Sequence, residues 1–231
     1  MDFSKIIIFI NTVRYLRVKQ IYYRIYYLLK NIFFDTRKKS YRYSSFKQIF
    51  WENGIDSSET YKHQERTFKF LNISHSFSNE IDWNINKYGK LWNYNLNYFD
   101  FINQKKLSKT DGLILIQDFL KNKDVLTSGN DPYPTSLRCI NWVKFLSKNK
   151  INITRIQQTL FDDFTYLSNN LEYHLLANHL LENAFSLFFG SYYFQNEKFY
   201  QKSKKLLKNQ LEEQILKDDI LVAFVRPENA E

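Results

Sequence analysis

Hydrophobic residues recur at helical spacing from about residue 90 to residue 215, and they predict a series of amphipathic helices. Their apolar stripes comprise Trp92, Leu96 and Phe99; Leu113, Ile116 and Leu120; Leu137, Ile140, Val143 and Leu146; Ile156, Leu160, Phe164 and Leu167; and Leu207, Leu211 and Ile215. The predicted N-caps are Ser108 or Thr110, Thr135 or Ser136, and Thr154. The loop at 128–134, with its two prolines, ends one helix sharply. Because no repeat of fixed length is visible, we expect an all-α fold of helical hairpins in a closed or partly closed ring.

Another helix is predicted over Leu171 to Phe194, with a break at Gly190 and Ser191. It is apolar on almost all sides, which indicates that it is buried. It nevertheless carries two histidines, two asparagines and a glutamate within ten residues. A polar group buried without a partner costs about 1–3 kcal/mol, so these side chains either satisfy one another or line a cleft. Spacing of i, i+4 allows the pairs His174–Asn178, Asn178–Glu182 and His179–Asn183.

Metal binding is not predicted for this helix. His174 and His179 are five residues apart, which is about 140° around a helix, so they cannot chelate one ion as an i, i+4 pair would. The single cysteine, Cys139, excludes an intrachain disulfide and is expected in the core. We therefore predict neither a metal nor a cofactor.

Composition supports a helical protein. Five glycines and three prolines in 231 residues are too few for a turn-rich β-sandwich. Periodicity is weakest at residues 31–90, where we expect loops and short helices. No stretch has the length of a membrane span, and the apolar run Ile6–Ile10 is too short for a signal peptide. No targeting signal is evident in the sequence, so the cytoplasm is the default location.

The excess positive charge lies in the first fifty residues. They contain eleven Lys and Arg against Asp2 and Asp35, a net charge of +9 that equals the net charge of the whole chain. Charge confined to one segment disfavours a nucleic-acid-binding domain. Residues 4–30 alternate basic and apolar groups, which predicts a basic amphipathic helix. This helix either packs across the main domain or contacts a membrane surface or a partner.

Two segments resemble the signature motifs of heparinase II/III-like polysaccharide lyases. One is the LEYHLLANHLLENA run at 171–184, and the other is the PYPTSLRCINW run at 132–142. Weaker similarities are GKLWNYNLNYFD at 89–100, VRYLR at 13–17 and EEQIL at 212–216. The resemblance covers most of residues 13–218 in the order that the family has them.

This resemblance implies an incomplete (α/α) toroid, and cleavage of uronate-containing, glycosaminoglycan-like polysaccharide by β-elimination. Removing the proton at C5 of a uronate is hard while the adjacent carboxylate is charged, so the site must neutralise that carboxylate. A Tyr or His then takes the proton, and a Tyr protonates the leaving O4. By resemblance, Asn178 neutralises the carboxylate and His179 is a neighbouring base or stabiliser. The candidate substrate-binding residues are Arg138, Trp142, His174, Glu182, Tyr133 and Trp92.

Some of these assignments have structural alternatives. Arg138 and Trp142, at i, i+4, suit an anion contact and a sugar-stacking face, but Arg138 equally suits a structural ion pair. Trp92 and Tyr94 suit a cleft wall, but aromatic core is the simpler interpretation of each.

Three regions are expected: a basic N-terminal arm at 1–50, the toroid fragment at 51–218 and a divergent tail at 219–231. In the family a β-sandwich domain follows the toroid, and the tail does not resemble that continuation. We therefore expect a truncated or frameshifted reading frame, with weak or absent lyase activity because the family's downstream Tyr and His are missing. The alternative function is a non-catalytic helical module that binds acidic polysaccharide or an anionic membrane surface through its arm.

Overall fold

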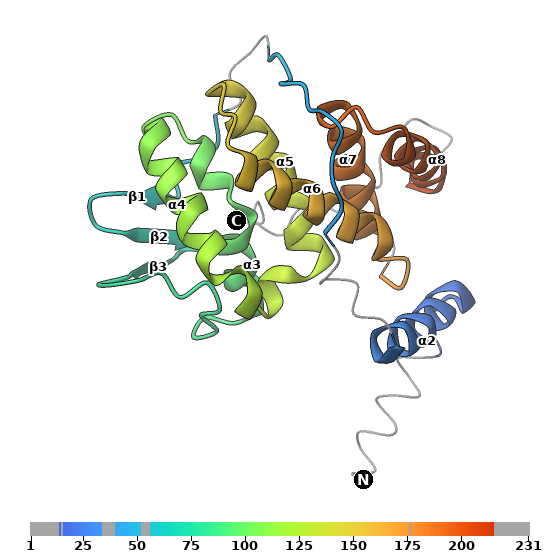
Figure 1. Cartoon of the computed structure of the whole chain (residues 1–231). Coiled ribbons are helices and arrows are strands. Elements are labelled where there is room, and N and C mark those ends of the chain that lie inside the picture. The colour runs from blue at the N-terminus through green and yellow to red at the C-terminus, as the bar shows by residue number, and fades with distance from the viewer. Residues whose placement is uncertain (1–13, 15, 34–39, 52–55, 176, 215–231) are drawn as a thin grey trace, which may run out of the picture.

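The computed structural model describes residues 14, 16–33, 40–51, 56–175 and 177–214 (Figure 1). In these residues the chain forms seven α-helices and three short strands. The helices are α2 (Val18–Phe33), α3 (Lys90–Tyr98), α4 (Lys109–Asn122), α5 (Pro132–Lys148), α6 (Thr154–Asn169), α7 (Ala177–Tyr193) and α8 (Glu197–Gln214). The strands are β1 (Tyr61–Lys62), β2 (Thr67–Phe70) and β3 (Ile73–Ser76). The protein is therefore mostly helical, as predicted, but it is not all-α.

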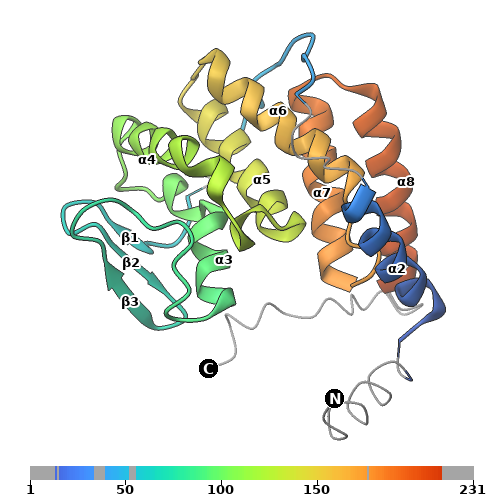
Figure 2. The ribbon, with the colours of Figure 1, turned by 60° about the horizontal axis from the view of Figure 1, so that its bottom comes forward.

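Helices α3, α5 and α7 are consecutive neighbours in the helical part of the fold (Figure 2). Helix α6 packs against both α5 and α7, and α8 packs along α7. The core between them is aromatic, and Trp92, Trp142 and Phe164 are fully buried in it. Gly190 lets α6 and α7 approach closely, because a Cβ there would lie 2.6 Å from the ring of Phe164. Helix α7 runs through Gly190 to Tyr193, so the break predicted at this glycine was wrong.

The helix starts were predicted with mixed success. Ser108 caps α4 as expected, because its side chain accepts a hydrogen bond from the Asp111 backbone N–H at 3.1 Å. Helix α5 instead begins at Pro132, upstream of the caps predicted at 135–136. Proline suits this first position because it has no N–H to leave unpaired.

The three strands form an antiparallel sheet in the order β1-β2-β3, at the edge of the helical layer (Figure 1). Phe68 and Phe70 of β2 point inward and pack on Phe101, while Lys69 between them is exposed. This alternation is the period-2 pattern of a half-buried strand. The described part of residues 40–89 contains the predicted loops, but these three strands take the place of the predicted short helices.

Helix α2 lies at the edge of the fold, beside the ends of α7 and α8 (Figures 1 and 2). Arg17, just before it, forms an ion pair with Glu213 of α8. Residues 1–13, and the tail predicted at 219–231, lie outside the described residues. Within the described chain, none of the helices combines the length and the hydropathy that a bilayer crossing requires.

Candidate functional site

Helix α7 begins at Ala177, so the prediction of one helix from Leu171 was wrong. The Glu172 backbone N–H donates to the Asn183 Oδ1 at 2.9 Å, which folds the preceding segment back along α7. This hydrogen bond joins residues that are eleven apart in the sequence, and it could not form if α7 extended back to Leu171. His174 consequently lies in a turn and cannot form the predicted i, i+4 pair with Asn178.

The folded-back segment brings a buried carboxylate into the site. The Asn183 amide Nδ2 donates to Glu172 Oε2 at 3.2 Å and to Ser136 Oγ of α5 at 2.8 Å. Ser186 Oγ adds a hydrogen bond to the Ser136 carbonyl at 3.0 Å. Asn183, Ser136 and Ser186 are fully buried, and Glu172 is 4% exposed. A carboxylate held in this way has a fixed position from which it can orient a neighbour.

That neighbour is His179. Its Nδ1 lies 3.4 Å from Glu172 Oε1, close enough for a charge interaction although the ring N–H is not aligned for a hydrogen bond. Its ring packs on the Tyr133 ring, with 4.3 Å between centroids. With Nδ1 next to the carboxylate, Nε2 is the ring nitrogen left for a ligand. The side chain is 30% exposed, so it can meet a ligand.

Asn178 occupies the first turn of α7 and is partly exposed. Its Oδ1 accepts a hydrogen bond from the His179 backbone N–H at 3.1 Å. Asn178 and Glu182 are at i, i+4 spacing on α7 and therefore share one side of the helix.

A cavity of about 730 Å³ lies between α3, α5, α7 and the β2–β3 turn. Glu182 lines it, one turn beyond Asn178, and so does Leu137, one turn beyond Tyr133. Asn178, His179 and Tyr133 are not part of this lining, but each stands within about one helical turn of a residue that is. The polar residues of the lining include Lys69, Asn95, Asn141, Lys144, Asp56 and Asp100. Amides, amines and carboxylates in this mixture suit a ligand rich in hydroxyl groups.

Tyrosines continue the cluster from Tyr133 toward α3. The Tyr98 ring lies 5.9 Å from the Tyr133 ring and 6.4 Å from the Tyr94 ring, between centroids. The Tyr94 hydroxyl donates to Asp131 Oδ2 at 2.5 Å. Burial raises the pKa of Tyr94, and its hydrogen bond to Asp131 raises it further, so this phenol stays protonated.

Arg138 is fully buried and holds the helices together. Its guanidinium donates to the Gly129 carbonyl at 2.7 Å and to Thr135 Oγ1 at 3.2 Å, and lies 3.5 Å from Asp163 Oδ2. It also stacks over the Phe119 ring at 4.7 Å. These contacts correspond to the structural ion pair that the sequence left as the alternative.

Trp92 and Trp142 have no exposed surface in this structure. The Trp92 indole Nε1 donates to the Ile73 carbonyl at 3.1 Å, which fixes it under the sheet. A sugar ring cannot reach either side chain. Helical spacing alone does not distinguish such core aromatics from aromatics that line a cleft. Cys139 is also fully buried, as predicted.

His174 faces α2 rather than the cavity lining. Its ring packs against Tyr27 at 5.4 Å, and its backbone carbonyl accepts from Gln20 Nε2 at 3.4 Å. Nδ1 is buried without a hydrogen-bond partner among the described residues. Burial lowers the pKa of this imidazole, and the charge of Arg24 lowers it further. These contacts associate His174 with the docking of α2.

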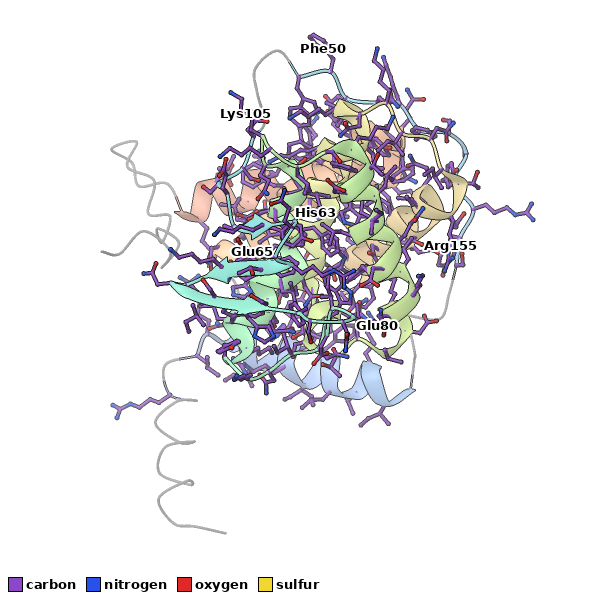
Figure 3. All side chains as sticks on the ribbon, turned by 90° about the vertical axis from the view of Figure 1, so that its left-hand side faces the viewer. Phe50, His63, Glu65, Glu80, Lys105 and Arg155 are labelled. Carbon is purple, nitrogen blue, oxygen red and sulfur yellow. The ribbon has the colours of Figure 1, made fainter. Side chains whose placement is uncertain are left out.

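The other two histidines lie on the sheet. His63, at the surface near β1, is 3.3 Å from Asp111 (Figure 3), and His75 on β3 bonds the Tyr88 hydroxyl at 3.1 Å. Across the described residues, no group of three or more His, Cys, Asp or Glu side chains is placed to hold a metal ion.

Glu172, Asn183 and Tyr98 are the site residues that sequence reasoning did not assign. Glu172 stands two residues before His174, and only the folded-back chain brings it to His179. Comparisons with protein-family models, curated proteins and solved structures find no match for this chain. Its function is therefore inferred from the geometry of the site.

Proposed function

We propose that this chain is a polysaccharide lyase domain that acts on uronate-containing, glycosaminoglycan-like polysaccharide by β-elimination. The observation that carries the proposal is the placement of His179, between the Glu172 carboxylate and the Tyr133 ring, beside Asn178 and next to a large polar cavity. An oriented imidazole, a phenol and a primary amide are the groups that the elimination requires.

The chemistry assigns a role to each of these groups. The Asn178 amide donates to the uronate carboxylate and so stabilises the charge that develops on it. His179 Nε2 takes the proton from C5, the C4–O4 bond breaks, and a C4–C5 double bond forms. The Tyr133 hydroxyl gives its proton to O4, and the proton on His179 returns to Tyr133, which restores both groups.

Electrostatics of the cavity favour a sugar polymer over a nucleic acid. Its lining balances Lys69 and Lys144 with Asp56, Asp100 and Glu182, so it is not strongly cationic. A nucleic-acid groove needs an excess of positive charge to neutralise phosphates. A uronate polymer is also anionic, so Lys69 and Lys144 are the groups of the lining that would pair with its carboxylates, while the amides and carboxylates bind its hydroxyl groups.

The arrangement of helices supports a finer proposal, an incomplete (α/α) toroid. Contacts of Tyr133 with His179 and of Ser136 with Asn183 pair the starts of α5 and α7, so the two helices run parallel. Helix α3 lies on the other side of α5, and α6 packs against both α5 and α7. Parallel inner helices joined by flanking helices are the arrangement expected of such a toroid.

The test is an elimination assay with the full chain. Heparan sulfate, chondroitin sulfate, hyaluronan and alginate are incubated with the protein, and the ultraviolet absorbance of the unsaturated uronate is followed. We expect slow turnover of at least one polymer. His179→Ala and Asn178→Ala are each expected to lower kcat by about 100-fold or more.

Matched controls are His63→Ala, at the surface, and Asn122→Ala, at the end of α4, where the amide bonds the Asp118 carbonyl at 3.0 Å. Both should keep wild-type turnover. The proposal is overturned if no polymer gives unsaturated product, or if turnover survives in both site variants. Polymer binding without turnover would instead support the non-catalytic module.

A further inference from the structure

Helix α2 turns its polar side toward the protein. Gln20 Nε2 donates to the Leu175 carbonyl at 3.3 Å, and the Tyr27 hydroxyl donates to the Leu171 carbonyl. Lys30 Nζ bonds Asn170 Oδ1 at 3.1 Å, and Tyr23 stacks on Tyr173 at 4.5 Å. The helix is therefore anchored by hydrogen bonds and ring stacking, not by its aliphatic side chains.

The aliphatic side chains of α2 are exposed, with the exception of the half-buried Ile21. A helix at 3.6 residues per turn places them on one arc of roughly 160°. The exposed members are Val18 at 84%, Tyr22 at 62%, Ile25 at 54%, Tyr26 at 44%, Leu28 at 66%, Leu29 at 52% and Ile32 at 73%. An amphipathic helix of a water-soluble domain normally shows the opposite orientation. We call these seven side chains the outer face of α2.

Positive charge borders the outer face on both sides. Lys19 lies at one border and Arg24 at the other, and both are exposed. Arg17 precedes the helix, and the helix contains no acidic residue. Apolar and tyrosine side chains with one cation at each border fit the boundary between lipid headgroups and acyl chains.

We propose that the outer face of α2 docks this protein on an anionic lipid surface. At 16 residues the helix is about 24 Å long, which suits a helix lying in the plane of the membrane interface. The acyl chains receive the aliphatic side chains, and the lipid phosphates pair with Lys19 and Arg24. An acidic polysaccharide satisfies the cations but offers no hydrocarbon to the apolar arc, so lipid is the occupant that uses both features.

This docking is independent of the lyase proposal, because the outer face points away from the site.

The test is flotation of the full chain with vesicles of phosphatidylcholine alone and with vesicles that also contain phosphatidylglycerol. We expect binding to the anionic vesicles that weakens as salt is raised. The double variant Lys19→Gln and Arg24→Gln should bind about 25-fold more weakly, at about fivefold per charge. The triple variant Tyr22→Gln, Ile25→Gln and Leu29→Gln should lose binding.

The control replaces three exposed apolar residues on other elements, as Ile114→Gln, Val125→Gln and Tyr192→Gln, which are 49%, 66% and 58% exposed. It should bind vesicles like the wild type. Circular dichroism of all variants should match the wild type, since the replaced side chains are not buried.

Several outcomes would overturn the proposal. They are no binding to anionic vesicles, equal binding to both vesicle types, or unchanged binding of the triple variant. A dimer in sedimentation that the triple variant dissociates, without vesicle binding, would show that the face joins two copies. Heparin capture that the double variant loses, without vesicle binding, would assign the cations to polysaccharide. Vesicle binding and turnover of a soluble polymer are separate measurements. The docking proposal and the lyase proposal can therefore be overturned independently of each other.

Discussion

Replacing Asn183 by leucine, which has a similar volume, tests the network that places the carboxylate beside His179. The substitution removes three hydrogen bonds that the amide makes, at 2.9 Å to the Glu172 N–H, 3.2 Å to Glu172 Oε2 and 2.8 Å to Ser136 Oγ. It leaves a buried N–H unpaired, which costs about 1–3 kcal/mol, and deprives a buried carboxylate of a donor, which costs about 1.5–3 kcal/mol. We therefore expect the free energy of unfolding to fall by about 3–5 kcal/mol.

The measurement is urea unfolding followed by circular dichroism and tryptophan fluorescence. Asn122→Leu is the control, because its amide makes one bond in a half-buried position, and it should cost about 1 kcal/mol or less. Under conditions where Asn183→Leu is folded, its turnover should also fall, since Glu172 no longer orients His179. A decrease of less than about 1 kcal/mol in the free energy of unfolding would refute the reasoning, because the hydrogen bonds of Asn183 would then not be what holds the Glu172 segment against α7.

Two further predictions concern buried charge and pH. Arg138→Met should lower the free energy of unfolding by about 2–4 kcal/mol in the same urea assay, because it leaves the Gly129 carbonyl and Thr135 Oγ1 without their buried donor, while Asp163 keeps its ion pair with Lys123. Arg155→Met, at the exposed surface (Figure 3), is the control and should change little. The pKa of His174 is lowered in the folded state, so the unfolded state binds more protons, and stability should decline as pH falls below about 6.5. His174→Phe should flatten that part of the stability curve, and an unchanged curve would contradict the assigned burial.

Regular elements with strong local signals were predictable. The period of the apolar residues located the helical region, and Ser108 marked the start of α4 correctly, because a cap depends on contacts within one turn. The sheet was missed because its strands are two to four residues long and are defined by pairing with one another. A local pattern of that length is too short to separate a strand from a loop.

The site was predictable only as a set of residues. Asn178, His179, Tyr133 and Glu182 were singled out from the sequence; in the structure Glu182 lines the cavity, His179 packs on Tyr133, and Asn178 precedes His179 in the first turn of α7. Their proposed roles in catalysis stay predictions. Arg138 and the two tryptophans were also singled out, but their burial depends on which helix faces pack together, and periodicity does not specify that.

The sequence by itself determined the helical character of the chain, the confinement of its positive charge to the first fifty residues and the amphipathic period of α2. Each of these depends on residue type or on spacing within a few turns. Only the tertiary structure decided that α2 turns its aliphatic side outward and that Glu172 lies beside His179. These facts depend on contacts such as those of Gln20 with Leu175 and of Asn183 with Ser136, between segments far apart in the chain. Local spacing carries no information about such contacts, because they form only when the packed core brings the segments together.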